Sequence, residues 1–180
     1  MVGESILPSY RFYRRRLRRQ WAELNDDYEY DAFVAYSDET PEVRRWVNVT
    51  MQTELEQNRG LKLFLHQRDL LREGFLLERI DDAMRRCRKT VLVLSPEFLQ
   101  SRICLYEAWS AHTSMVTEGR DAVVLVKLQA LPISGITEIL TSLMKIRECL
   151  PWTEDPAGQE LFWEDLKATL VPPPNNPINT

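Results

Sequence analysis

The sequence predicts an α/β fold in which helices cover both faces of a five-stranded parallel sheet. Short apolar runs alternate along the chain with longer stretches whose apolar residues recur at helical spacing. Residues 90–94, Thr-Val-Leu-Val-Leu, are apolar without alternation, as expected for a strand that is covered on both faces. The resulting order of elements, βαβαβαβαβα, is typical of a doubly wound fold with three layers.

Each strand is expected in a short apolar or β-branched run that is bounded by turn residues. The five expected strands are residues 30–37, 61–65, 90–94, 122–128 and 145–150. The last run is less apolar than the others, which places it at an edge of the sheet.

Helices are expected after each strand, at residues 40–59, 76–87, 104–118, 135–144 and 155–170. Thr40 is a favourable N-cap residue, Pro41 is favourable at the first helical position, and Gly60 ends this helix. Apolar residues recur three or four positions apart on the expected inward faces, which include Leu77, Cys87, Val116 and Leu161.

Charge is unevenly distributed along the chain. The net charge is −4, but residues 1–27 carry six arginines against four acids, a net of +2, so the remainder carries −6. We interpret the basic segment as a juxtamembrane segment that contacts an anionic membrane surface. A nucleic-acid arm and a solvated basic helix are the alternatives, and we expect no nucleic-acid partner. The arginines are Arg11, Arg14, Arg15, Arg16, Arg18 and Arg19.

The remaining sequence divides into one domain and a tail. Residues 28–170 hold all the expected strands and helices. Residues 171–180 contain four prolines and are expected to be disordered. No run of about 18 apolar residues occurs, so the transmembrane helix of a single-pass protein would lie outside this chain.

The metal-binding and thiol-bearing residues are few. Cys87, Cys104 and Cys149 are far apart, and each lies in an apolar pattern, which favours buried thiols in a reducing compartment. His66 and His112 are too few and too far apart to form a metal cluster with them. No glycine-rich phosphate-binding motif occurs. We therefore expect no metal ion and no cofactor.

The loop at residues 66–75 is the first candidate for a functional site. It follows the second strand, and binding residues of open parallel sheets gather beyond the carboxyl ends of strands. Leu70 and Leu71 lie there among charged residues. Exposure of two adjacent leucines to water is unfavourable unless they pack inward or are covered on binding. Alternatively, Arg68 and Asp69 form an ion pair that merely shapes the loop. The candidate partner-binding residues are Arg68, Asp69, Leu70, Leu71, Arg72, Glu73, Gly74 and Phe75.

Glu107 lies among apolar residues of the third expected helix. An acid in such a position is most often on the helix surface or paired with a nearby arginine. A catalytic role would require a cleft and a substrate within hydrogen-bonding distance.

Five motifs in order resemble the TIR domain, the Toll/interleukin-1 receptor module. The resemblance covers about residues 28–170, and the Tyr-Asp-Ala-Phe form of the first motif points to Toll-like receptors. The five motifs are Tyr30-Asp31-Ala32-Phe33-Val34-Ala35-Tyr36-Ser37, Arg68-Asp69-Leu70-Leu71-Arg72-Glu73-Gly74, the stretch 88–95, Cys104-Leu105-Tyr106-Glu107 and Phe162-Trp163.

The resemblance implies a flavodoxin-like fold and innate immune signalling through contacts between TIR domains. Residues 68–74 match the BB loop, the family's main interaction element. The implied partners are a second copy of the chain and TIR-containing adaptors. The basic segment would then lie between a receptor's membrane helix and its TIR domain, on the cytoplasmic side. A soluble TIR adaptor is the alternative.

The sequence departs from the family pattern at two places. The BB loop usually has Pro-Gly where this chain has Arg72-Glu73, and Gly74 follows one residue later. Loss of the proline frees φ and restores an amide donor, which leaves the choice of adaptor open. Some TIR domains cleave NAD with a glutamate that Glu107 matches, but Ile103 stands where those enzymes often have tryptophan. We expect no enzyme activity, with NAD cleavage through Glu107 as the alternative.

Overall fold

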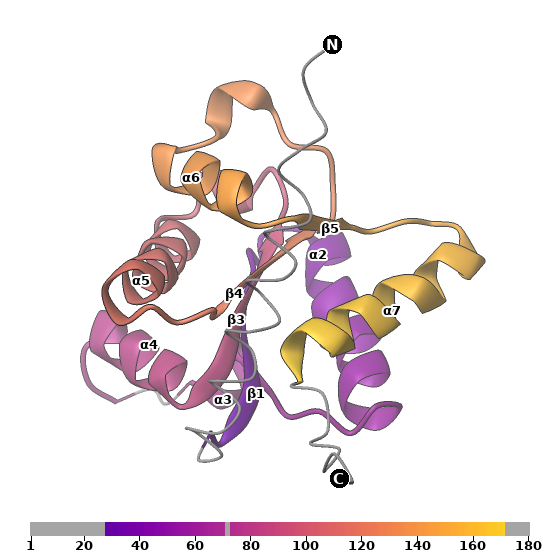
Figure 1. The fold of residues 1–180 in the computed structure, drawn as a ribbon, viewed down its shortest axis with the longest axis horizontal. Helices are drawn as coiled ribbons and strands as arrows, with labels where there is room; N and C mark the ends of the chain where they lie inside the picture. The colour runs from indigo at the N-terminus through magenta and orange to yellow at the C-terminus, as the bar shows by residue number, and fades with distance from the viewer. Residues whose placement is uncertain (1–27, 71–72, 172–180) are drawn as a thin grey trace, which may run out of the picture. The chain divides into compact units, whose positions relative to one another are not determined.

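A computed structural model of the chain describes residues 28–70 and 73–171. Residues 29–171 form one compact unit. At its centre is a five-stranded sheet in the order β2-β1-β3-β4-β5, in which all neighbouring strands are parallel (Figure 1). This is the flavodoxin-like strand order, and the expected fold class is confirmed. The expected basic segment 1–27 and the tail from residue 172 lie outside the described residues.

The strands occupy the expected runs, but their ends differ from expectation by up to four residues. An apolar run often continues past the last pairing of the ladder, as Tyr36 and Ser37 do after β1, where both remain buried. The fifth strand lies at an edge, as expected. The strands are β1 (Tyr30–Ala35), β2 (Leu63–Leu65), β3 (Cys87–Leu94), β4 (Val123–Lys127) and β5 (Cys149–Pro151).

The helices also follow the expected order. The first expected helix consists of α2 (Pro41–Arg45) and two π-helical segments, η1 (Trp46–Met51) and η2 (Thr53–Gln57). The others are α3 (His66–Asp69), α4 (Leu76–Arg85), η3 (Phe98–Gln100), α5 (Arg102–Glu118), η4 (Ile133–Gly135), α6 (Glu138–Ile146) and α7 (Pro156–Leu170).

The ends of the first helix are at the expected residues, but one cap differs. Thr40 is extended and precedes Pro41, yet its hydroxyl makes no capping hydrogen bond and is buried without a partner among the described residues. Gly60 adopts a φ of 70°, which a glycine accepts without strain. The fixed φ of Pro41 therefore contributes to helix initiation without help from the Thr40 side chain.

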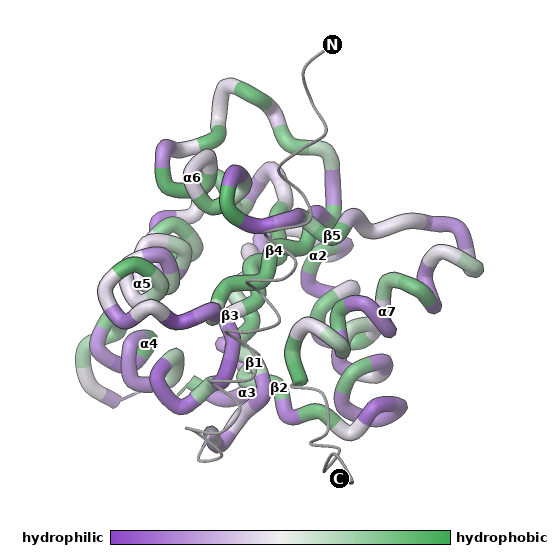
Figure 2. Tube along the Cα trace, viewed as in Figure 1, coloured by the Kyte–Doolittle hydropathy of each residue, from purple (hydrophilic) through white to green (hydrophobic). Residues whose placement is uncertain are grey.

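Side chains of the three central strands alternate between two cores, one on each face of the sheet. Figure 2 shows the apolar residues of these strands at the centre of the unit. One core receives Ala32, Val34, Val91, Val93, Val124 and Val126. The other receives Phe33, Ala35, Leu92, Leu94, Val123 and Leu125.

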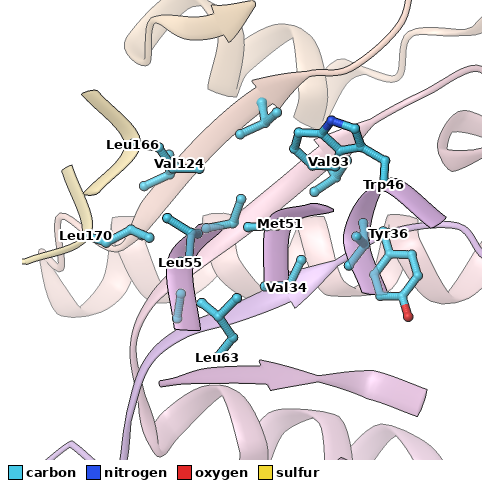
Figure 3. Close-up of a cluster of buried hydrophobic side chains, with 14 of the residues drawn as sticks. Val34, Tyr36, Trp46, Met51, Leu55, Leu63, Val93, Val124, Leu166 and Leu170 are labelled. Carbon is cyan, nitrogen blue, oxygen red and sulfur yellow. The ribbon is translucent and has the colours of Figure 1, made fainter. Parts of the chain in front are cut away.

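Two groups of helices cover the two faces (Figure 1). The first core is covered by α2, η1, η2 and α7, and Figure 3 shows Met51, Leu55 and Leu166 pointing into it. The second core is covered by α4, α5 and α6. The three-layer arrangement that the sequence predicts is therefore present.

Four aromatic side chains join α7 to η1 and to the segment after β5. The ring of Trp163 stacks on Trp46 with 5.5 Å between centroids, and Phe162 meets Trp152 edge to face at 5.2 Å. Trp163 is only 3% exposed. Such pairs add to the free energy gained by burying the rings.

Three residues that we expect to point inward are exposed instead. Leu77 is 47% exposed, Val116 64% and Leu161 67%. Each lies at the border of its helix's apolar stripe. In α7 the stripe is extended on the other side by Trp163, so Leu161 turns to the surface. Cys87 also differs, because it is the first residue of β3 and does not belong to the preceding helix.

We expect Trp163→Ala to lower the free energy of unfolding by about 3–5 kcal/mol, because it removes a buried ring and leaves a cavity. Leu161→Ala, two residues earlier on the same helix, should change it by about 0.5 kcal/mol or less. Urea unfolding followed by circular dichroism measures both values. Equal losses in the two variants would contradict this assignment of the α7 faces.

Candidate functional site

The candidate loop follows β2, the edge strand next to β1. The topological switch point lies between β1 and β3, because the connection after β1 runs to β2 on one side and the connection after β3 runs to β4 on the other. Sites of open α/β sheets gather beyond the carboxyl ends of the strands around such a point, and the candidate loop lies one strand away from it. The segment at residues 66–75 is not entirely a loop, because its first four residues form the short helix α3.

Arg68 anchors the base of this segment. Its guanidinium donates to both carboxylate oxygens of Glu56 at 2.8 and 2.9 Å and to the backbone carbonyl oxygen of Leu63 at 2.6 Å. It also forms an ion pair with Asp69 at 2.8 Å. The hydrogen bond to Glu56 contributes most to raising the pKa of Arg68. The guanidinium therefore fixes α3 to both η2 and β2.

Asp69, the partner of Arg68 in this ion pair, also binds the end of β2. Its Oδ2 accepts a hydrogen bond of 2.8 Å from the backbone N–H of Leu65, the last residue of β2. The ion pair between Arg68 and Asp69, which the sequence analysis gives as the alternative to partner binding, is present. Neither side chain is available as a free charge at the tip of the loop.

The tip of the segment is shaped differently from its base. Gly74 adopts a φ of 90°, which a residue with a Cβ atom rarely accepts. Phe75 follows it and is 78% exposed, and Glu73 is also exposed. Leu70 is half-buried against the second core, whereas Leu71 and Arg72 lie outside the described residues. Phe75 is therefore the uncovered apolar side chain that the described part of the loop presents.

Glu107 is buried, contrary to the expectation of a surface acid or an arginine pair. It is 1% exposed on α5, and its Oε1 lies 3.1 Å from Nδ1 of His66. Desolvation raises the pKa of Glu107, and the hydrogen bond with His66 acts in the opposite direction without cancelling the effect. The sequence carries no signal for this partnership, because 41 positions separate the two residues.

The segment after β1 also contacts α3. The Gln67 side chain donates a hydrogen bond to Asp38, and the Tyr36 hydroxyl donates one to Asn48 at 3.1 Å. The first of these bonds joins the segment after β2 to the segment after β1, and the second joins the end of β1 to η1.

The cysteines and histidines form no group that could hold a metal ion within the described residues. Cys87 and Cys104 are buried, and desolvation raises the pKa of each thiol to about 12, which keeps them protonated and unreactive. Cys149 is only half-buried, so the expectation of burial holds for two of the three cysteines. Across the described part of the chain, no helix is long and apolar enough to cross a membrane.

Protonation of Glu107 should make stability depend on pH. Its pKa is raised from the ordinary 4.5, so the folded chain holds this proton more tightly than the unfolded chain. The resulting stability is fully present below pH 4.5 and is lost as pH rises through the folded-state pKa.

In the Glu107→Gln variant the side chain at this position cannot ionise. The melting temperature of the variant should therefore fall less than that of the parent protein between about pH 5 and pH 8. Thermal melts at several pH values measure the difference between the two. The control is Glu78→Gln, which replaces an exposed acid on α4 by the same amide and leaves the contact between His66 and Glu107 intact. A constant difference for Glu107→Gln would contradict the prediction.

The sequence matches known proteins over most of its length. A family model described as TIR domain matches residues 29–160. Toll-like receptor 2 of Macaca mulatta is 37% identical over 150 residues, which cover 81% of this chain and 19% of that receptor. Toll-like receptor 2 type-2 of Gallus gallus is 35% identical over 145 residues, which cover 78% of this chain and 18% of that receptor. This chain thus spans about a fifth of the length of the receptors it matches.

Solved structures agree with this match. The TIR domain of the Toll-related receptor TRR-2 from Hydra magnipapillata aligns with a TM-score of 0.60 at 25% identity, over 77% of this chain and 95% of that one. A metazoan TIR-STING receptor from C. gigas aligns with a TM-score of 0.61 over 83% of this chain and 42% of that one, and its 20% identity shows the fold alone. The chain belongs to the TIR domain family.

Proposed function

We propose that this chain is the intracellular signalling domain of a Toll-like receptor and acts by associating with other TIR domains. The observation that carries the proposal is an exposed Phe75 on a loop whose base is fixed by Arg68 and Asp69. An uncovered aromatic side chain beside a fixed base offers a partner a large apolar contact area. The likeness to receptors of innate immunity supports the same function.

The partners that fit are a second copy of this chain and the TIR domains of adaptors. Pairing of receptors would raise the local concentration of the domain. Contacts that are too weak to hold two free domains together would then become effective through multivalency. The loop supplies one such contact in each copy.

The basic segment, residues 1–27, supports a position of the domain next to a membrane. Its six arginines would lie against the anionic inner surface of a membrane, below a transmembrane helix of a single-pass receptor. These residues lie outside the described part of the chain. They are Arg11, Arg14, Arg15, Arg16, Arg18 and Arg19. A soluble adaptor would lack the membrane span, so the length and hydropathy of the full gene product separate the two possibilities.

The loop should bind differently from one with the usual Pro-Gly pair. Arg72 and Glu73 replace that pair, so the charge at the tip can select among adaptors while Phe75 supplies apolar contact area. We therefore include Leu71, Arg72 and Glu73 in the proposed interface with Leu70, Gly74 and Phe75. Arg68 and Asp69 support it from below.

Substitution Phe75→Ser should weaken self-association and adaptor capture at least tenfold, since the loss of one aromatic anchor typically costs more than about 1.4 kcal/mol. Leu71→Glu should act in the same direction. Sedimentation analysis and pull-down with a purified TIR adaptor measure the two associations.

The matched control for this experiment is Leu161→Ser, which removes another exposed apolar side chain, from α7 and away from the loop. All three variants should keep the circular dichroism spectrum of the parent. Unchanged association in both loop variants would remove the loop from the interface.

NAD cleavage through Glu107 is the second function to consider. A catalytic acid must reach its substrate, but Glu107 is 1% exposed and its carboxylate is occupied by His66. Ile103, a turn earlier on α5, is 38% exposed and supplies no aromatic surface. We therefore propose a binding module without this activity.

Purified domain at high concentration should not consume NAD above the background rate, because Glu107 is inaccessible. Chromatography of nicotinamide release measures this, both in dilute solution and in crowded samples that favour assembly. Turnover that is present in the parent and abolished by Glu107→Gln would instead identify the chain as an enzyme.

A further inference from the structure

We propose that the outer edge of β2 is a surface for strand addition by β2 of a second copy, and that the side chains of Glu56, Arg68 and Asp69 keep it closed. We call these three side chains the edge cap. Association at this edge is distinct from the proposed function, in which copies meet through the exposed Phe75.

β2 is an edge strand, so one side of its backbone has no neighbouring strand. Its other side pairs with β1. The C=O of Lys62 accepts a hydrogen bond of 2.8 Å from the N–H of Asp31 and therefore points toward β1. Because successive residues of a strand direct their backbone groups to opposite sides, those of Leu63 and Leu65 point outward. Outward N–H and C=O groups of an edge strand are a template for pairing with another chain.

Three of these outward groups contact the edge cap. The N–H of Leu63 donates to Oε1 of Glu56 at 3.2 Å, and its C=O accepts from Nη2 of Arg68 at 2.6 Å. The N–H of Leu65 donates to Oδ2 of Asp69 at 2.8 Å. Side chains thus occupy the hydrogen-bonding positions that a neighbouring strand would use.

The edge cap is one connected row of charged groups. The guanidinium of Arg68 donates to both carboxylate oxygens of Glu56 at 2.8 and 2.9 Å and pairs with Asp69 at 2.8 Å. The row reaches solvent, since the Arg68 side chain is 38% exposed. An added strand would have to displace these ion pairs and return the charges to water. Charged side chains on an edge strand oppose pairing in the same way in other proteins.

The side chains of the strand take no part in the closed edge. Leu63 is 0% exposed and Leu65 is 1% exposed, and both belong to the core beside η1 and η2. A partner at this edge would therefore meet backbone groups. Recognition by backbone hydrogen bonds is the mode by which an extended strand adds to a sheet.

The pattern of outward groups specifies a second copy as the partner. In an antiparallel pair centred on Phe64, the C=O of Leu63 in one copy would face the N–H of Leu65 in the other. A twofold axis repeats this hydrogen bond, so each copy would give one donor and one acceptor. The strand is thus complementary to itself once the edge cap is removed.

Amide hydrogen exchange, measured by NMR residue by residue on this chain, tests whether the edge cap shields the strand. Glu56→Ala should speed exchange of the Leu63 N–H by about tenfold or more, and Asp69→Ala should do so for the Leu65 N–H. The N–H of Phe64 points toward β1, so its exchange should change by less than about threefold in both variants.

The matched control for exchange is Glu54→Ala. Glu54 lies on η2 like Glu56 and also pairs with an arginine, Arg59, but it makes no hydrogen bond with β2. Its removal should leave exchange of Leu63 and Leu65 unchanged. Slow exchange of both amides in Glu56→Ala and Asp69→Ala would overturn the edge cap, as would equal acceleration in Glu54→Ala.

Sedimentation analysis tests the strand-addition surface. The double variant Glu56→Ala/Arg68→Ala should self-associate about tenfold more strongly than the parent, with an infrared signal of intermolecular strands. Glu54→Ala/Arg59→Ala removes another acid and arginine that pair with each other, and it leaves the net charge equally unchanged. It should associate as the parent does. Association that does not rise in the first variant, or that rises equally in both, would overturn the surface.

Phe75→Ser separates this surface from the proposed function. Added to Glu56→Ala/Arg68→Ala, it should leave the gained association in place, because that association runs through β2. If it abolishes the gain, the copies meet through the loop and the strand-addition surface is overturned. If Phe75→Ser alone leaves association of the parent intact, the proposed function fails, while the exchange and sedimentation results still decide the edge of β2.

Discussion

The fold depends on burial of both faces of the central strands. β1, β3 and β4 send alternate side chains into two separate cores, so each strand is held by two layers of helices at once. Neither layer can form its core without the other, because the strands between them have no polar face to leave in water. The helices are therefore confined to two sides, and the loops at the carboxyl ends of the strands are left free to carry function.

The candidate loop combines a rigid base with an exposed tip. Its base is joined to the scaffold through hydrogen bonds of the Arg68, Asp69 and His66 side chains, while its tip carries Phe75 in solvent. Charge-assisted hydrogen bonds are directional and hold a segment in one orientation. Apolar contact is less directional and suits the surface that meets a partner. A hydrogen-bonded base with an exposed apolar tip is consistent with the proposed reversible association of the domain.

Glu107 shows that burial of an acid does not by itself identify a catalytic site. By the family resemblance its position on α5 matches that of the glutamate in TIR domains that cleave NAD, and its carboxylate is enclosed and contacts His66. A buried acid with a raised pKa is often a sign of catalysis, but the same perturbation arises wherever a polar group is buried to hold two elements together. Access to substrate, and not the pKa, distinguishes the two roles.

The sequence by itself determined the fold class, the order of its elements and the place of the candidate loop. Those features depend on local signals: the spacing of apolar residues, Pro41 and Gly60 at helix ends, and Gly74 where φ is positive. Only the tertiary structure decided that Glu107 is buried on His66 and that Leu161 is exposed while Trp163 is enclosed. These outcomes depend on which residues meet across long sequence separations, and a periodic pattern gives the face of a helix only to within one residue.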